Sequence, residues 1–162
     1  MDLPKCKATR LKGYDYSTPG MYFVTICTHN RQCILSEITV GEGFHALPQN
    51  ILSPIGIEIE KSIKFINDNY IDVTIDKFVI MPNHIHLIVN LCNSGVHGNP
   101  PLQNVIGQLK SYTTNKFGNT LWQRSYHDHI IRTKEDYDKI WNYIDTNVIQ
   151  WNNDCFYSNE RP

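Results

Sequence analysis

The stretch from Phe78 to Asn90 constrains the fold most, because it reads as two short apolar strands joined by a tight turn. Pro82 has no amide hydrogen for a strand ladder and fixes its own φ angle, so the first strand has to end there. His84 and His86 lie two residues apart, and side chains two apart on a strand point to the same face. The apolar residues that alternate with them point to the opposite face.

Two imidazoles on one face of a strand form half of a metal site. The same pattern also describes a strand with a half-exposed polar face, and two ligands are too few to decide between these readings. The choice therefore depends on the rest of the chain.

The remaining apolar patterns predict an alternation of strands and helices. Strands are expected at 21–28, 73–81, 84–90 and 126–132, and helices at 51–69, 102–118 and 134–151, with Ser53 and Pro54 as the N-cap and first residue of the first helix. The polar connection 29–48 has room for a small hairpin near 38–40. This order is the split βαβ pattern of a ferredoxin-like βαββαβ antiparallel sheet, an α+β fold, with an added C-terminal helix that carries a tyrosine.

The length of 162 residues suits one domain. We expect a basic and aromatic leader at 1–19, the sheet with two helices at 20–132, and the tyrosine helix at 133–151. No apolar run approaches the roughly 20 residues that span a bilayer. The five cysteines are scattered without a Cys-x-x-Cys pair, which favours reduced thiols and a cytoplasmic protein.

The predicted final helix places Tyr143 and Asn147 one turn apart on a flank of its apolar stripe. A tyrosine with an amide one turn along can place a nucleophile beside a metal ligand, although a tyrosine at this boundary can also simply pack its ring. Tyr112 is a rival nucleophile, but Lys116 stands one turn after it. A second His-x-His pair surrounds the polar Asp128, so that strand lacks a buried opposite face there.

The chain resembles the single-tyrosine HUH transposases, and especially their REP-associated tyrosine transposase branch. The resemblance runs from about Tyr14 to Trp151 and rests on four pieces. These are Tyr-Phe-Val-Thr at 22–25, Met-Pro-Asn-His-Ile-His-Leu at 81–87, Trp-Gln-Arg at 122–124 with Asp-His-Ile-Ile-Arg at 128–132, and Tyr-Ile-x-x-Asn at 143–147. The chain departs from the family where Asn147 is followed by Val148 and Ile149 instead of a proline-containing turn.

The resemblance implies metal-dependent cleavage and rejoining of single-stranded DNA, with hairpin-bearing DNA as the partner. It implies that His84, His86 and Asn147 bind Mg²⁺ or Mn²⁺ and that Tyr143 is the nucleophile, forming a 5′-phosphotyrosine. Whether the tyrosine helix acts within its own chain or is exchanged in a homodimer stays open. A host-retained relative that processes chromosomal hairpin repeats, or an inactive module that binds single-stranded DNA, would carry much of the same pattern.

The formal net charge of −1 argues against indiscriminate coating of nucleic acid, yet basic residues gather in the leader and at 110–139. The leader's two tyrosines look exposed and could stack on bases. The leader could equally be packed on the edge of the domain. The candidate DNA-binding residues are Arg10, Lys12, Tyr14, Tyr16, Lys110, Lys116, Arg124 and Arg132. The alternative is a solvated surface of mixed charge.

Overall fold

A computed structural model of the chain describes residues 13–40, 46–92, 100–118 and 120–157. Its strands are β1 (Gly20–Cys27), β2 (Ser36–Val40), β3 (Pro48–Leu52), β4 (Val73–Ile80), β5 (His84–Leu91) and β6 (His127–Ile131). Its helices are α1 (Pro54–Asn69), α2 (Leu102–Phe117) and α3 (Lys134–Thr146), with short 3₁₀ turns η1 (His29–Arg31) and η2 (Trp151–Asn153). Among these elements no helix is long and apolar enough to cross a membrane.

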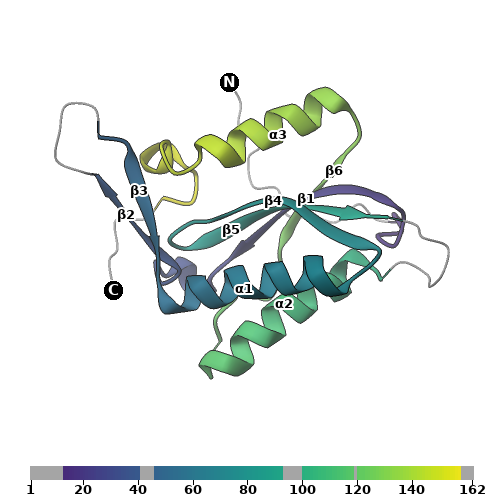
Figure 1. Ribbon diagram of the computed structural model, residues 1–162, viewed down its shortest axis with the longest axis horizontal. Coiled ribbons are helices and arrows are strands. Elements are labelled where there is room, and N and C mark those ends of the chain that lie inside the picture. The colour runs from purple at the N-terminus through teal and green to yellow at the C-terminus, as the bar shows by residue number, and fades with distance from the viewer. Residues whose placement is uncertain (1–12, 41–45, 93–99, 119, 158–162) are drawn as a thin grey trace.

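The main sheet has the strand order β4-β5-β1-β6, and every neighbouring pair is antiparallel. Helices α1 and α2 cover one face of this sheet, and α3 lies across the other (Figure 1). The ferredoxin-like sheet with an added C-terminal helix, predicted from the sequence, is confirmed.

Strand β5 lies at the centre of the sheet and separates two environments. Ile85, Leu87 and Val89 point into the large core beneath α1 and α2. His84 and His86 point to the opposite face, where Ile88 continues the same row and packs against α3. The turn before β5 keeps the two imidazoles in register, because the Met81 amide donates to the His84 carbonyl (2.8 Å). Because side chains alternate along β5, both imidazoles lie on the sheet face that α3 covers.

Helix α1 begins as the sequence predicts. The Ser53 hydroxyl accepts a hydrogen bond from the Gly56 amide (3.1 Å), and Pro54 occupies the first helical position. The first turn packs closely on the chain before β2: a Cβ added at Gly56 would lie 2.2 Å from the Leu35 carbonyl oxygen. Only glycine lets the helix approach the backbone this closely.

We therefore expect Gly56→Ala to destabilise the protein by about 2 kcal/mol, because the clash outweighs the helix propensity that alanine adds. The matched control is Gly107→Ala in α2, where an added Cβ meets nothing within 4 Å. That variant should be neutral or slightly more stable. Urea unfolding of both variants tests this, and equal stabilities would contradict the tight approach at Gly56.

Several element boundaries differ from the sequence prediction. Residues 51 and 52, expected to begin a helix, belong to β3 and pair with β2 in a separate two-stranded sheet. The predicted hairpin near 38–40 is therefore real but longer. Strand β6 is one residue shorter at each end than 126–132. Helix α3 ends at Thr146 and not near Trp151, since the chain turns into η2 after Asn147.

The leader is only partly as expected. Tyr14, Tyr16 and Tyr22 form an aromatic cluster, with the Tyr14 and Tyr16 rings 5.1 Å apart, edge to face. The expectation that Tyr16 is exposed is wrong: it is 7% exposed, and its carbonyl accepts a hydrogen bond from the Leu102 amide (3.0 Å) at the start of α2. Arg10 and Lys12 lie outside the described residues.

Helix α3 is tied to the sheet edge by Lys77 of β4. The Lys77 ammonium forms an ion pair with Asp145 (2.6 Å) and lies 4.5 Å from the centre of the Trp141 ring. Both partners lie two residues from Tyr143, one on each side. The contact therefore fixes the part of α3 that carries the tyrosine, through one ion pair and one cation–π interaction.

Candidate functional site

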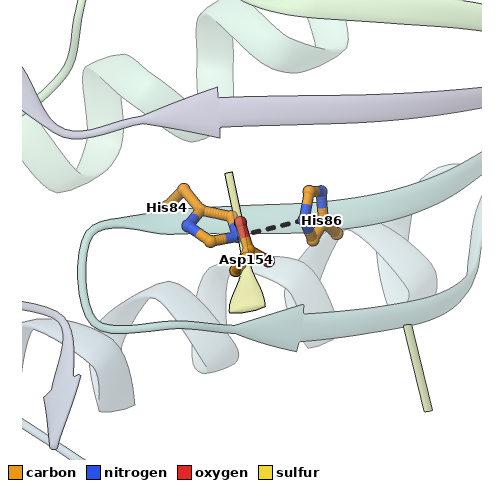
Figure 2. Close-up of side chains that lie close together, drawn as sticks. All are labelled: His84, His86 and Asp154. Carbon is orange, nitrogen blue, oxygen red and sulfur yellow. Dashed lines mark hydrogen bonds and ion pairs between the residues drawn. The ribbon is translucent and has the colours of Figure 1, made fainter. Parts of the chain in front are cut away.

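The side chains of His84 and His86 meet between β5 and α3. Their Nε2 atoms are 3.0 Å apart, and the residues are 0% and 1% exposed. Figure 2 shows the two rings on β5, with Asp154 from the segment after α3 beside them. Burial lowers the pKa of His86 to about 3, and burial, His86 and Arg31 lower that of His84. Both rings are therefore neutral at pH 7 and keep lone pairs that can bind a metal.

Neighbouring side chains fix the orientation of each ring. The Asn83 amide group donates to the Phe156 carbonyl (2.8 Å), so its oxygen faces His84 Nδ1 (2.9 Å) and accepts that proton. His84 Nε2 therefore presents a lone pair to the site. His86 Nδ1 lies 2.8 Å from the Thr25 hydroxyl, which can donate or accept and so suits either tautomer. Such outer partners orient the histidine ligands of known metal sites.

Tyr143 and Asn147 reach the same place from α3 and its end. The Tyr143 hydroxyl lies 3.3 Å from His86 Nε2, and its ring packs edge-on against Phe23. Asn147 is buried, and its Oδ1 has no hydrogen-bond partner among the described residues. A buried oxygen without a partner costs about 1–3 kcal/mol. A cation at this position would remove that cost.

Asp154 is the member that sequence reasoning missed. Its side chain is 2% exposed, and Oδ2 lies 4.0 Å from His84 Nε2. Oδ2 also accepts hydrogen bonds from Asn147 Nδ2 (3.0 Å) and the Tyr143 hydroxyl (3.3 Å). Suitable ligand atoms of His84, His86 and Asp154 lie within 4.8 Å of one another. A buried carboxylate beside two neutral imidazoles favours a cation between them.

The donor set is that of a possible divalent-metal site. Two imidazole nitrogens and one carboxylate oxygen converge, and the Asn147 oxygen is free to join them. No thiolate is part of the cluster, so the set does not match a closed zinc site. The residues present could therefore hold a divalent metal ion.

The protonation of Tyr143 depends on the same cluster. Burial is the largest cause that raises the pKa of the Tyr143 phenol, and the charge of Asp154 raises it further. The phenol is therefore protonated at pH 7 in the absence of a cation. Its hydroxyl donates a hydrogen bond to Asp154 Oδ2 (3.3 Å).

The alternatives from the sequence lie elsewhere. Tyr112 is half-exposed on α2, the helix that covers the other face of the sheet. His129 is exposed and pairs with Asp136 on α3 (2.7 Å), so its ring is tied to a carboxylate outside the cluster. Neither residue joins the group around His84 and His86.

The candidate DNA-binding residues lie in different parts of the structure, and they differ in how exposed and how free of protein partners their side chains are. Lys110 is half-buried, and its ammonium donates to the carbonyls of Gln123 (2.5 Å) and Arg124 (3.1 Å). Lys116 forms an ion pair with Glu58 (2.7 Å). The side chains of Arg124 and Arg132 are exposed, and Tyr14 is half-buried. The structure therefore leaves the two arginines freest to meet a ligand.

Comparison with known proteins finds similar proteins, while no model of a protein family matches the chain. An uncharacterized protein of Haemophilus influenzae is 34% identical over 175 residues, which cover 93% of this chain and 92% of that protein. A solved structure of a REP-associated tyrosine transposase bound to a REP hairpin superimposes with a TM-score of 0.64. It is 19% identical, and the match covers 88% of this chain and 74% of that one. This second similarity establishes the fold.

Proposed function

We propose that this chain cleaves and rejoins single-stranded DNA. The chain belongs to the same family as the Haemophilus influenzae protein. It has the fold of a REP-associated tyrosine transposase. One observation carries the proposal: the Tyr143 hydroxyl lies 3.3 Å from His86 Nε2 within a buried cluster suited to a divalent cation. A phenol held against such a cluster is the arrangement that attack on a phosphodiester needs.

In the proposed reaction Tyr143 is the nucleophile. Its Oη forms a bond to the phosphorus and the bond from phosphorus to the 3′ oxygen breaks, which leaves a 5′-phosphotyrosine and a strand with a free 3′-OH. Asp154 is placed to accept the phenol proton, since its Oδ2 already accepts that hydrogen bond, and water supplies the proton that the departing 3′ oxygen takes up. The phosphotyrosine keeps the ester energy, so a 3′-OH can reverse the step without ATP.

His84, His86, Asn147 and Asp154 would hold the cation. A bound Mg²⁺ or Mn²⁺ supplies Lewis-acid stabilisation of charge on the phosphate oxygens. Thr25 orients the His86 ring and Asn83 orients the His84 ring. The Asn147 amide and the Asp154 carboxylate would complete the donor set.

Tyr143 acts within its own chain in this proposal. It already contacts His86 of the same chain, and Lys77 holds α3 on its own sheet. The segment from η2 to Phe156 lies over the imidazoles, with the Phe156 ring centre 4.6 Å from that of His84. A phosphodiester can reach the buried rings only when part of this segment moves aside.

The two oxygen ligands allow a direct test. We expect Asp154→Asn to weaken Mn²⁺ binding at least about tenfold, because the variant loses the one carboxylate that the described residues bring to the cluster. Asn147→Ala should weaken it less, since that change removes a neutral oxygen. Electron paramagnetic resonance of bound Mn²⁺ measures both without reference to activity. Wild-type affinity in Asp154→Asn would exclude this residue as a ligand.

The function itself is tested by covalent trapping. The protein is incubated with single-stranded oligonucleotides that carry hairpins of different sequence, together with Mn²⁺. We expect a protein–DNA adduct that survives denaturation and disappears when a chelator is present. Tight hairpin binding without cleavage or adduct under any of these conditions would instead support the inactive binding module.

A further inference from the structure

The turn η1 follows β1 directly and carries backbone strain. Asn30 and Arg31 have φ angles of 53° and 55°, in the left-handed region that residues other than glycine rarely adopt. The turn is nevertheless held firmly, because the Arg31 amide donates to the Thr28 carbonyl (3.1 Å) and the Thr28 hydroxyl to the Gln32 carbonyl (2.9 Å). Backbone strain that is held in place by such contacts is commonest at active sites and ligand-binding segments.

The strained turn lies at the same end of the sheet as the candidate site. Cys27, the last residue of β1, pairs with His84. The Arg31 guanidinium carbon lies 5.4 Å from the centre of the Phe156 ring, and that ring lies against His84. Among the described residues Arg31 has no ion-pair partner. Within the described part of the chain it is therefore an exposed cation without an ion pair, at the edge of the cluster.

The other side of the turn borders an open cavity of about 620 Å³. It is lined by His29, Asn30, Thr120, Trp122, Gln123 and Arg124. Lys110 bonds the carbonyls of two of these residues and so brings a second positive charge to this wall. The side-chain amides of Asn30 and Gln123 and the guanidinium of Arg124 supply hydrogen bonds and positive charge, which together suit the sugar-phosphate part of a nucleotide.

We propose that η1 binds the DNA backbone beside the scissile bond, with Arg31 contacting a phosphate that flanks it and the adjoining cavity taking the neighbouring nucleotide. The inference rests on the proposed function and adds a residue and a subsite to it. Arginine suits the role, because its guanidinium binds phosphate oxygens through two parallel hydrogen bonds. Its place above Phe156 keeps it at the mouth of the site without burying its charge.

The test compares Arg31→Gln, Arg31→Lys and Arg31→Gly with wild type on one hairpin-bearing oligonucleotide. Arg31→Gly removes the side chain yet suits the left-handed turn, so it keeps the test valid if glutamine disturbs folding. The control is Lys64→Gln on α1, which lies on the opposite face of the sheet. Binding is measured in chelator, where no cleavage occurs, across a range of salt concentrations.

We expect Arg31→Gln and Arg31→Gly to weaken binding about tenfold and to lower the slope of log K against log salt by about 0.7. Lysine should restore part of the affinity and most of the slope. Replacing one phosphate next to the cleavage position with a methylphosphonate should weaken wild type but not Arg31→Gln. An abasic nucleotide beside that phosphate should also weaken wild type, since the base would leave the cavity empty.

Two results would overturn the inference. In the first, Arg31→Gln and Arg31→Gly both bind the oligonucleotide within twofold of wild type. In the second, methylphosphonate replacement weakens wild type and Arg31→Gln equally at every position tested. The failure of the proposed function looks different, because wild type would then bind the oligonucleotide without forming an adduct in Mn²⁺. Absence of binding by wild type would contradict both.

Discussion

Replacing Tyr143 with phenylalanine is expected to abolish strand cleavage and adduct formation and to leave the fold intact. The variant lacks the oxygen that would form the bond to phosphorus, and loss of a nucleophile reduces turnover by about 10⁴-fold or more. Only weak contacts disappear with it, since the hydroxyl lies 3.3 Å from both His86 Nε2 and Asp154 Oδ2. The stability should therefore change by no more than about 1 kcal/mol.

The matched control for this variant is Tyr112→Phe. Tyr112 is also a helical tyrosine, but it is half-exposed on the helix that covers the opposite face of the sheet. We expect that variant to cleave at the wild-type rate. Thermal unfolding, hairpin binding and cleavage are measured for both proteins. Retained cleavage in Tyr143→Phe, with the fold intact, would remove Tyr143 from the proposed mechanism.

Replacing His86 with alanine is expected to weaken Mn²⁺ binding at least about 100-fold and to abolish cleavage, because one of the two imidazole ligands is lost. Hairpin binding should stay within about threefold of wild type, since most DNA affinity comes from phosphate contacts elsewhere. His86 is fully buried, so His86→Gln is made in parallel to limit the cavity. Mn²⁺ binding by electron paramagnetic resonance, hairpin binding and strand cleavage are measured for each variant.

The control for the metal site is His129→Ala. His129 is 54% exposed and belongs to the second His-x-His pair of the sequence. Its loss should change neither Mn²⁺ affinity nor cleavage. Wild-type cleavage by His86→Ala, or by wild type in excess chelator, would show that the reaction does not depend on this cluster.

The central part of the fold was predictable because it follows from local patterns. Alternation along β5 placed both imidazoles on one face, and the helical repeat placed Tyr143 and Asn147 on one side of α3. The Gly118 end of α2 is equally local, since its φ of 72° requires a left-handed residue. Each of these features depends on residues a few positions apart.

The missed features depend on contacts between distant parts of the chain. Helix α3 ends at Thr146 although the apolar pattern continues to Trp151, because Trp151 and Phe156 turn back to pack over the histidines. Asp154 enters the cluster only through this reversal. The only local signal is an acidic residue, Asp154, between the aromatic residues Trp151 and Phe156. Hydrophobic periodicity does not indicate a function for such a residue. Tyr16 was misjudged for the same reason, since it is buried by the start of α2.

The most direct test of the account is the identity of the residue that becomes attached to DNA. The adduct formed with a hairpin-bearing oligonucleotide in Mn²⁺ is digested, and the DNA-linked peptide is sequenced by mass spectrometry. We expect the modified peptide to contain Tyr143, linked to a 5′-phosphate. DNA attached to Tyr112, or to any residue other than Tyr143, would contradict the proposed mechanism.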